Sequence, residues 1–231
     1  MPENMHSASE ITASSKPRLI KEEEVTKERF VLFLDILGFK DRVARHSHDE
    51  VMRVLQELQQ SVSDSRKKHA KENIDYSIFS DSILLFTQDA TADSLVALSA
   101  AACDIMQTAI LKAVPMKGAL AMGKMSCDTP KQLFFGQPLI DAYLLEESTK
   151  YYGILVHHSA EEAVKKQGAF YRDVPACLKC GNVNHYELNW HSRNEGVHVT
   201  DILEALEKLR QTVSDEPRKY IDNTKAIINT K

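Results

Sequence analysis

The chain has 231 residues, of which 43% are hydrophobic and 27% charged, a balance typical of a protein that buries a core within one domain. Its net charge of -4 excludes a globally basic surface, so we expect no nucleic-acid partner. No apolar run is expected to reach the roughly 20 residues of a membrane span, and the polar first residues have no signal-peptide core. We therefore expect no membrane association and a cytoplasmic location.

The first half of the chain predicts a strand, a helix and a hairpin. Residues 1–26 are polar and rich in Ser, Glu and Lys, which predicts a disordered or loosely ordered segment. The continuous apolar run over residues 30–35 predicts a buried strand. Apolar residues recur at helical spacing from Val51 to Val62 and predict a helix. The stretch NIDYSIFSDSILLFT then predicts two strands that meet in a hairpin at Ser80-Asp81-Ser82.

The second half continues with a buried, Ala-rich helix over residues 91–112 and a strand over 116–125. A helix follows over residues 138–149, with Pro138 in its first turn. The order β-α-β-β-α-β is that of the split βαβ, or ferredoxin-like, unit, which predicts an α+β fold. Beyond it, GILV and HYELNW predict extra strands and SAEEAVKKQG a helix, and residues 199–228 predict a C-terminal helix or helix pair.

Two acidic residues fall at the ends of these strands. Asp35 ends the first apolar run, and Asp81 lies in the predicted hairpin turn. A split βαβ sheet brings the two elements side by side, so the carboxylates converge and would repel each other unless a cation such as Mg²⁺ or Mn²⁺ neutralises them. The backbone that follows Asp35 can offer N–H groups to a polyphosphate. Taken singly, each Asp is better explained as a helix cap or a turn residue.

Together, four motifs resemble those of class III nucleotide cyclases over residues 29–190: FLDILGF, FSDSILLF, KGALAMG and FFGQPLIDAYLLEES. The resemblance implies a catalytic domain over residues 27–195 with a helical extension over 196–231. It implies that Asp35 and Asp81 are catalytic and, with the Ile36 carbonyl, bind two Mg²⁺ or Mn²⁺ ions in each active site. The implied triphosphate-binding residues are Leu37, Gly38 and Phe39 in the turn, and the basic residues Lys179 and Lys117.

The chain departs from adenylate and guanylate cyclases at the positions that read the purine. Ser77 stands where the family has a Lys or Glu, and Leu133 stands where it has a second, adenine-reading acid. These two residues are therefore the candidates for a different base pocket. In the helix after Gly136, the family's transition-state Asn and Arg are replaced by Ile140 and Leu144.

The motifs LDILGF and FSDSILLF, with a G-x-x-x-x-D-A-Y helix, are similar to the pyrimidine cyclases of Pycsar anti-phage defence. This resemblance implies a lyase that converts UTP, or as second choice CTP, to the 3′,5′-cyclic monophosphate and pyrophosphate. It also implies a homodimer with active sites at the interface and a separate effector that reads cUMP or cCMP. Two alternatives stay open: an inactive cyclase-like module that binds nucleotides, and a palm-like enzyme that joins two nucleotides. The hairpin lacks the GG-D/E-E/D-F signature of a diguanylate cyclase.

Two other groups of residues are assigned to structure. Cys177, Cys180, His185 and His191 suggest a zinc site, but their spacing is irregular and no second CxxC is present, so strand and turn positions explain them better. The pair His157-His158 is predicted to begin a helix or to lie in a loop rather than to act as a catalytic base.

Overall fold

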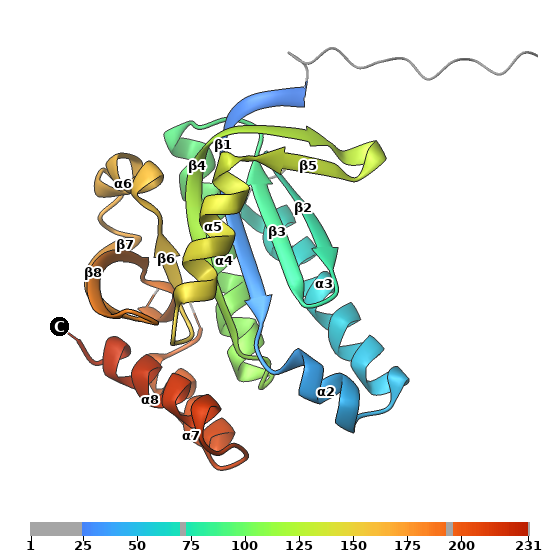
Figure 1. The fold of residues 1–231 in the computed structure, drawn as a ribbon, viewed down its shortest axis with the longest axis vertical. Coiled ribbons are helices and arrows are strands. Elements are labelled where there is room, and N and C mark those ends of the chain that lie inside the picture. The colour runs from blue at the N-terminus through green and yellow to red at the C-terminus, as the bar shows by residue number, and fades with distance from the viewer. Residues whose placement is uncertain (1–24, 70–72, 193–195, 231) are drawn as a thin grey trace, which may run out of the picture.

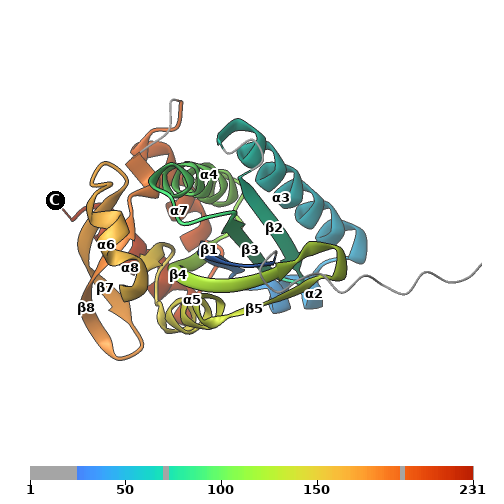
Figure 2. The same cartoon turned by 90° about the horizontal axis from the view of Figure 1, so that it is seen from above.

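The computed structural model describes residues 25–69, 73–192 and 196–230. Within these residues the chain forms one eight-stranded sheet with helices on both faces (Figures 1 and 2). The strands are β1 (Thr26–Ile36), β2 (Ile74–Phe79), β3 (Ser82–Thr87), β4 (Met116–Asp128), β5 (Leu133–Gly136), β6 (Ile154–Val156), β7 (Tyr171–Leu178) and β8 (Gly181–Leu188). The helices of eight or more residues are α3 (His48–His69), α4 (Ala92–Leu111), α5 (Gln137–Ser148), α6 (His158–Lys165), α7 (Val199–Arg210) and α8 (Glu216–Ile228). A shorter helix, α2 (Phe39–Arg45), follows β1.

The sheet confirms the predicted ferredoxin-like α+β fold. Its strand order is β2-β3-β1-β4-β6-β8-β7, with β5 paired to β4 outside this path, and the first four strands have the order of a split βαβ unit. Strand β1 runs antiparallel to both β3 and β4. The C-terminal strands extend the sheet beyond β4 through the parallel pair β4 and β6.

The central run of β1, residues 30–34, is apolar without interruption because it is buried on both faces of the sheet. Val31 and Leu34, which point to opposite faces of the strand, are both fully buried. Helices α3 and α4 cover one face of the sheet, and α5 packs on the other face against β4 and β1 (Figure 2). This two-sided burial is the reason that a continuous rather than alternating pattern predicted the strand correctly.

Most predicted elements are confirmed, and three were missed. The segment 1–26 lies outside the described residues except for its last two, of which Thr26 already belongs to β1. Helix α2 has no buried residue and therefore no apolar periodicity. Strand β5 has only four residues. Strand β7 contains Pro175, which disfavours a strand interior but is tolerated here because β7 is an edge strand.

One helix contradicts the expectation that no apolar segment reaches membrane-spanning length. By length and composition alone, α4 is long and apolar enough to cross a membrane. Of the 18-residue stretch of α4 that is most apolar, 67% is buried inside the protein. It lies beside α3 on one face of the sheet and also contacts α7, so apolar residues are required around most of its circumference (Figure 2). In this fold α4 is the central core helix.

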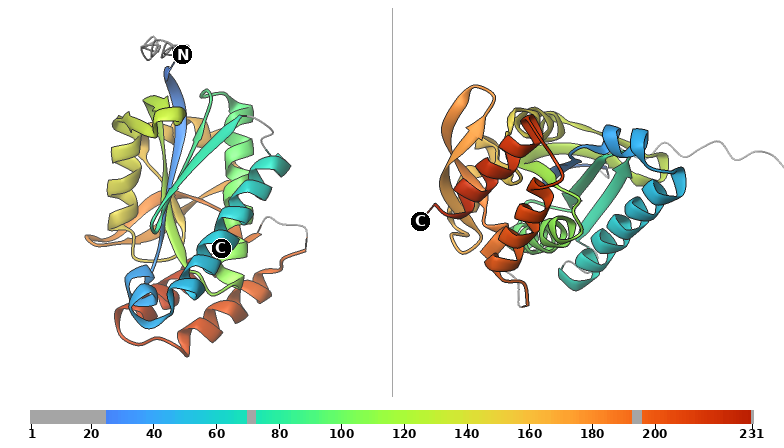
Figure 3. Two further views of the ribbon diagram at one scale, coloured as in Figure 1. Left: turned by 90° about the vertical axis from the view of Figure 1, so that its right-hand side faces the viewer. Right: turned by 90° about the horizontal axis from the view of Figure 1, so that it is seen from below.

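The two C-terminal helices are packed on the body of the protein. Ile202 and Leu206 of α7 and Ile221 of α8 belong to the same hydrophobic core as the sheet. Arg172 on β7 donates hydrogen bonds to the carbonyls of Ile227 and Thr230 and so holds the end of α8. Helices α7 and α8 lie at the end of the molecule where β1 ends (Figures 1 and 3).

Candidate active site

The two predicted acidic residues lie at neighbouring strand ends. In the register of β1 and β3, Asp35 is opposite Ser82, the residue that follows Asp81. The Ile36 N–H donates a hydrogen bond of 2.9 Å to the Asp81 carbonyl, so the hairpin turn is attached to the end of β1. Ser80 has a φ of 55°, the left-handed conformation that closes this tight turn. The predicted convergence of Asp35 and Asp81 is therefore present.

The surroundings of Asp35 favour a bound cation. Burial, followed by the negative charges of Glu146 and Asp81, raises the pKa of the Asp35 carboxyl to about 7, although Lys117 and Lys40 oppose the shift. A carboxylate that is disfavoured in this way is stabilised by a positive ion placed between it and its acidic neighbour. The oxygen donors present, two carboxylates and main-chain carbonyls, are those that Mg²⁺ and Mn²⁺ prefer.

The protein side chains alone do not complete a metal cage. Among the described residues, no group of three or more His, Cys, Asp or Glu side chains is arranged to bind a metal. Ions at Asp35 and Asp81 would therefore depend on further oxygens from the Ile36 carbonyl, water and a substrate. This pattern is usual for Mg²⁺ at phosphate-handling sites.

The structure gives Lys117 a role that differs from the predicted one. Lys117 lies on β4 directly opposite Asp35. Its buried Nζ donates hydrogen bonds to the carbonyls of Glu146 (2.8 Å) and Thr149 (3.2 Å) and lies 3.0 Å from Glu146 Oε1. Burial raises the pKa of Glu146, and the Lys117 ammonium opposes that shift. Because three oxygens already surround this ammonium, we assign Lys117 to holding the end of α5 rather than to the triphosphate.

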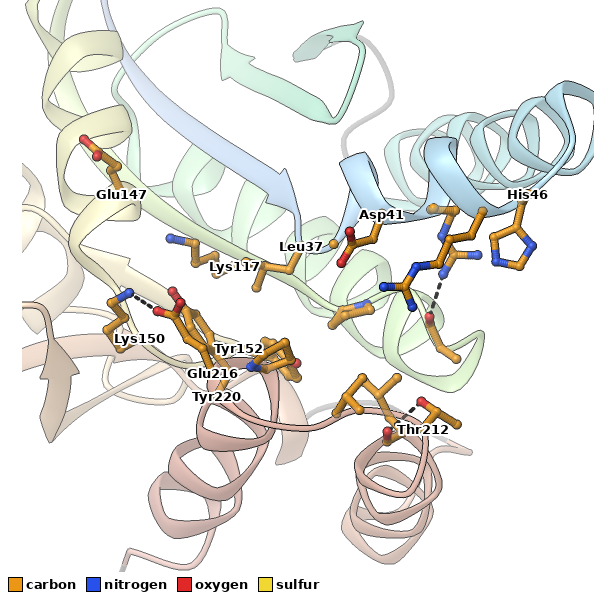
Figure 4. A pocket seen from close by; sticks show the side chains of 18 of the residues that line it. Leu37, Asp41, His46, Lys117, Glu147, Lys150, Tyr152, Thr212, Glu216 and Tyr220 are labelled. Atoms are coloured by element: carbon orange, nitrogen blue, oxygen red, sulfur yellow. Dashed lines mark hydrogen bonds and ion pairs between the residues drawn. The ribbon is translucent and has the colours of Figure 1, made fainter.

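A cavity of about 580 Å³ begins at the turn after β1 (Figure 4). Leu37 and Gly38 form part of its wall, and Lys117 and Lys179 line it as well, so four of the five predicted triphosphate residues meet there. Phe39 is not among the lining residues. Gly38 has a φ of 74°, a conformation that glycine adopts without strain.

Of the three turn amides predicted to bind phosphate, one is already used. The Leu37 N–H donates a hydrogen bond of 2.9 Å to the Pro115 carbonyl. Within the described part of the chain, no backbone carbonyl is paired with the Gly38 or Phe39 N–H. The Gly38 amide, which belongs to a lining residue, is therefore the one at the cavity wall that can donate to an anion.

The cavity has more basic side chains than the sequence suggested. Five Lys or Arg residues line it, against three Asp or Glu residues. The basic residues not predicted from the sequence are Arg42 and Arg45 on α2 and Lys150 after α5. Three of these cations have acidic partners. Besides the pair of Lys117 with Glu146, Lys150 Nζ lies 2.6 Å from Glu216 Oε1, and Lys179 Nζ lies 2.8 Å from Glu147 Oε1. The excess of positive charge favours an anionic ligand.

The sequence missed these residues because no local pattern marks them. Arg42 and Arg45 belong to a short polar helix, and Lys150 lies in a connection between α5 and β6. Glu216 reaches Lys150 only because α8 packs onto the segment that precedes β6. The first turn of α8, which contains Glu216 and Pro217, carried no signal that would place it at a site.

The predicted base-pocket residues lie apart within one chain. Ser77 is half-buried on β2, opposite Leu84. Leu133 is exposed on β5 and pairs with Asp128, at the end of β4 opposite to Lys117. Within a single chain Leu133 therefore does not approach the two carboxylates, and it would reach such a site only across an interface.

The remaining predictions concern His and Cys residues. His157 is the N-cap of α6, where its side chain accepts a hydrogen bond from the Ser159 N–H, which confirms it as the start of a helix. The four cysteines, all of them in the described part of the chain, form no disulfide. Cys177 and His185 lie on β7 and β8, His191 is buried in a short 3₁₀ turn, and the described residues contain no metal-binding group that includes them.

Comparison with known proteins establishes the fold. No family model and no curated protein matches this sequence. Solved structures do match, and they define the fold as that of the class III nucleotide cyclase domain. The chain is similar to a monomeric guanylyl cyclase domain from the aquatic fungus Blastocladiella emersonii (TM-score 0.58, 19% identity, covering 71% of this chain and 98% of that one).

Two further solved structures share this fold. One is the guanylate cyclase domain from Catenaria anguillulae in complex with GTP (TM-score 0.56, 18% identity, 71% of this chain and 96% of that one). The other is a bacterial light-regulated adenylyl cyclase (TM-score 0.53, 15% identity, 80% of this chain and 98% of that one). The chain thus covers nearly the whole length of each of these cyclase structures.

Proposed function

We propose that this protein is a nucleotide cyclase, a lyase that converts UTP, or as second choice CTP, to the 3′,5′-cyclic monophosphate and pyrophosphate. The observation that carries the proposal is the placement of Asp35 and Asp81 at adjoining strand ends, immediately before a basic cavity lined by Leu37 and Gly38. A carboxylate pair next to an anion-binding cavity is suited to metal-assisted phosphoryl transfer.

In this proposal, Asp35, Asp81 and the Ile36 carbonyl hold two Mg²⁺ or Mn²⁺ ions. When bound, such ions lower the pKa of the ribose 3′-hydroxyl and stabilise the charge on the leaving pyrophosphate. The Gly38 and Phe39 amides and the Lys179 ammonium bind the phosphates and align the α-phosphorus with the 3′-oxygen. The 3′-oxygen then forms a bond to the α-phosphorus, the bond to pyrophosphate breaks, and the hydroxyl proton passes to solvent.

The choice of a pyrimidine rests on the residues that replace the purine-reading groups. Ser77 offers a hydroxyl where purine cyclases have a Lys or Glu, and Leu133 offers an apolar side chain where the adenine-reading acid stands. A small pocket with one hydroxyl suits a single-ring base, and the direction of its hydrogen bonds would separate uracil from cytosine. The likeness to Pycsar cyclases supports a cytoplasmic enzyme whose product is read by a separate effector during phage infection.

Exposed apolar side chains support a homodimer. They lie on β5, on α5 and at the tip of the β2–β3 hairpin. Helix α5 covers the face of the sheet opposite α3 and α4, and β5, which pairs with the end of β4, leads directly into it (Figure 2). The residues are Phe79, Leu133, Phe135, Ile140, Tyr143 and Leu144. An exposed group of large apolar side chains is typical of an interface. A partner on this face would bring its Leu133 toward the carboxylates, which one chain alone does not do.

Product analysis tests the proposal. The purified protein is incubated with each of ATP, GTP, CTP and UTP plus Mn²⁺, and the products are separated by mass spectrometry. We expect cyclic UMP or cyclic CMP, which is lost in Asp35→Asn and Asp81→Asn and retained in Asp49→Asn, a control on the exposed start of α3. Nucleotide binding without any product would favour the inactive module, and a dinucleotide product would favour the palm-like alternative.

A further inference from the structure

The C-terminal helices form one side of the basic cavity. Of its lining residues, Leu209 and Tyr220 belong to α7 and α8, and Thr212 lies in the connection between them (Figure 4). Helix α8 is fixed in place, because Asn223 Nδ2 donates to the Lys150 carbonyl at 2.8 Å and Thr224 Oγ1 accepts from the Tyr152 N–H at 2.8 Å. These hydrogen bonds fix the position of this side of the cavity, which we call the α7–α8 wall.

Lys150 is held at this wall by two residues of α8. Its Nζ lies 2.6 Å from Glu216 Oε1 and 5.3 Å from the centre of the Tyr220 ring. The hydrogen bond to Glu216 raises the pKa of Lys150 above its ordinary value, so the ammonium is charged at neutral pH. Figure 4 shows Lys150 and Glu216 on the side of the cavity that faces Lys117 and Leu37.

Two of the three Lys–Glu pairs around this cavity differ sharply in exposure. Lys117 and Glu146 have side chains only 7% and 4% exposed, so neither can leave the pair without an unpaired charge remaining buried. Lys150 and Glu216 are 27% and 63% exposed, so the Glu216 carboxylate can be released to water. Exposed ion pairs contribute little free energy, and a polyphosphate offers a higher negative charge and more oxygen acceptors than one carboxylate.

From this arrangement we infer that Glu216 is a displaceable counter-ion for Lys150, and that the polyphosphate chain of a nucleotide takes its place when the cavity fills. The inference rests on the proposed function for the identity of the nucleotide, and it concerns the same cavity. Lys150 binds the outer phosphates, and Glu216 weakens that binding by competing for the ammonium. The α7–α8 wall thereby sets the affinity of the cavity for its anion.

Calorimetric binding of inorganic tripolyphosphate and of pyrophosphate tests this without any catalytic step. We expect Lys150→Gln to weaken tripolyphosphate binding about tenfold and Glu216→Gln to tighten it about threefold, with the melting temperature of each variant near that of the wild type. Glu207→Gln is the matched control: it removes the same charge from α7 and breaks a 2.7 Å ion pair with Lys225, but Glu207 does not line the cavity. It should leave binding unchanged.

The double variant Lys150→Gln with Glu216→Gln separates competition from general charge. Competition predicts that Glu216→Gln gives no tightening once Lys150 is gone. Tightening that persists in the double variant, or tripolyphosphate binding that is unaltered by Lys150→Gln, would overturn the inference. If Lys150→Gln lost affinity for pyrophosphate but not for tripolyphosphate, the inference would also be overturned, because Lys150 would then bind the pyrophosphate product rather than the polyphosphate of the substrate. None of these outcomes depends on whether the protein cyclises nucleotides, which the product analysis decides separately.

Discussion

Two of the three Lys–Glu pairs around the cavity, Lys117–Glu146 and Lys150–Glu216, have the same chemistry and different surroundings. Lys117 and Glu146 are buried between β4 and the last turn of α5, whereas Lys150 and Glu216 lie at the exposed wall of the cavity. The buried ammonium is fixed by three oxygens, and the exposed one can exchange its partner. Burial, rather than residue type or closeness to a motif, decides which lysine holds the fold and which can meet an anion.

The largest effect that tests this contrast comes from the buried pair. Lys117→Gln should lower the free energy of unfolding by about 3 to 5 kcal/mol, because it leaves the Glu146 carboxylate buried without a counter-charge. Urea denaturation followed by circular dichroism measures it. The double variant Lys117→Met with Glu146→Leu should recover much of the loss. A cost below about 1 kcal/mol for Lys117→Gln would show that this pair is not structural.

A smaller effect on stability is expected at Asp35, whose burial outweighs the opposing charges of Lys117 and Lys40. Its pKa of about 7 lies above the ordinary value of 3.8, so the folded protein binds the proton more tightly than the unfolded chain does. The contribution of Asp35 to stability is therefore most favourable below about pH 4 and declines as the pH rises to 7.

Asp35→Asn, which cannot ionise, should accordingly stabilise the metal-free protein at pH 8 by about 1 to 2 kcal/mol, discounted for the partial exposure of the carboxylate, and have little effect at pH 4. Thermal melts at the two pH values measure the difference. Addition of Mn²⁺ at pH 8 should raise the melting temperature of the wild type but not of the variant. An equal effect of the substitution at both pH values would contradict the assigned pKa.

Substitution of Gly38, in the turn between the carboxylates and the cavity, should lower the free energy of unfolding by about 1 kcal/mol. Gly38→Ala places a Cβ on a residue with a φ of 74°, and no atom lies within 4 Å of that Cβ, so backbone strain is the whole cost. Chemical denaturation of Gly38→Ala measures it. Gly168→Ala, which also meets no atom within 4 Å and lacks a positive φ, is the control and should be neutral or stabilising. A loss several times larger than 1 kcal/mol would imply a rearranged turn.

The smallest effect on stability is expected at the exposed pair. Glu216→Gln should change the free energy of unfolding by less than about 1 kcal/mol, because an ion pair in contact with water contributes little. The same denaturation experiment applies, with Glu207→Gln as its comparison. A loss as large as that of Lys117→Gln would show that the two pairs are equivalent and would remove the distinction drawn between them.

The sequence predicted the centre of this site better than its walls. Asp35 and Asp81 could be brought together from the chain alone, because the apolar run and the hairpin determine which strands adjoin. The role of Lys117 could not be predicted, since it depends on how the end of α5 meets β4. The pairing of Lys150 with Glu216 is even harder to predict from the sequence, because the two residues are distant in the chain and no periodicity connects them.

The same reasoning explains the elements that were missed. Strong apolar patterns predicted α4 and β4 correctly because both are buried on most sides. Helix α2, which has no buried residue, left no such pattern, although it supplies Arg42 and Arg45 to the cavity. Residues whose positions depend on charge and packing between distant segments become visible only in three dimensions.

The central claim, that Asp35 and Asp81 form a cation-dependent nucleotide site, is tested most directly by Mn²⁺ binding. Electron paramagnetic resonance would count the ions bound in the presence of 3′-deoxy-UTP, which cannot cyclise. We expect two ions for each active site in the wild type and in Asp49→Asn, with ions lost in Asp35→Asn and in Asp81→Asn. Unchanged Mn²⁺ binding in both variants, with the proteins folded, would contradict it.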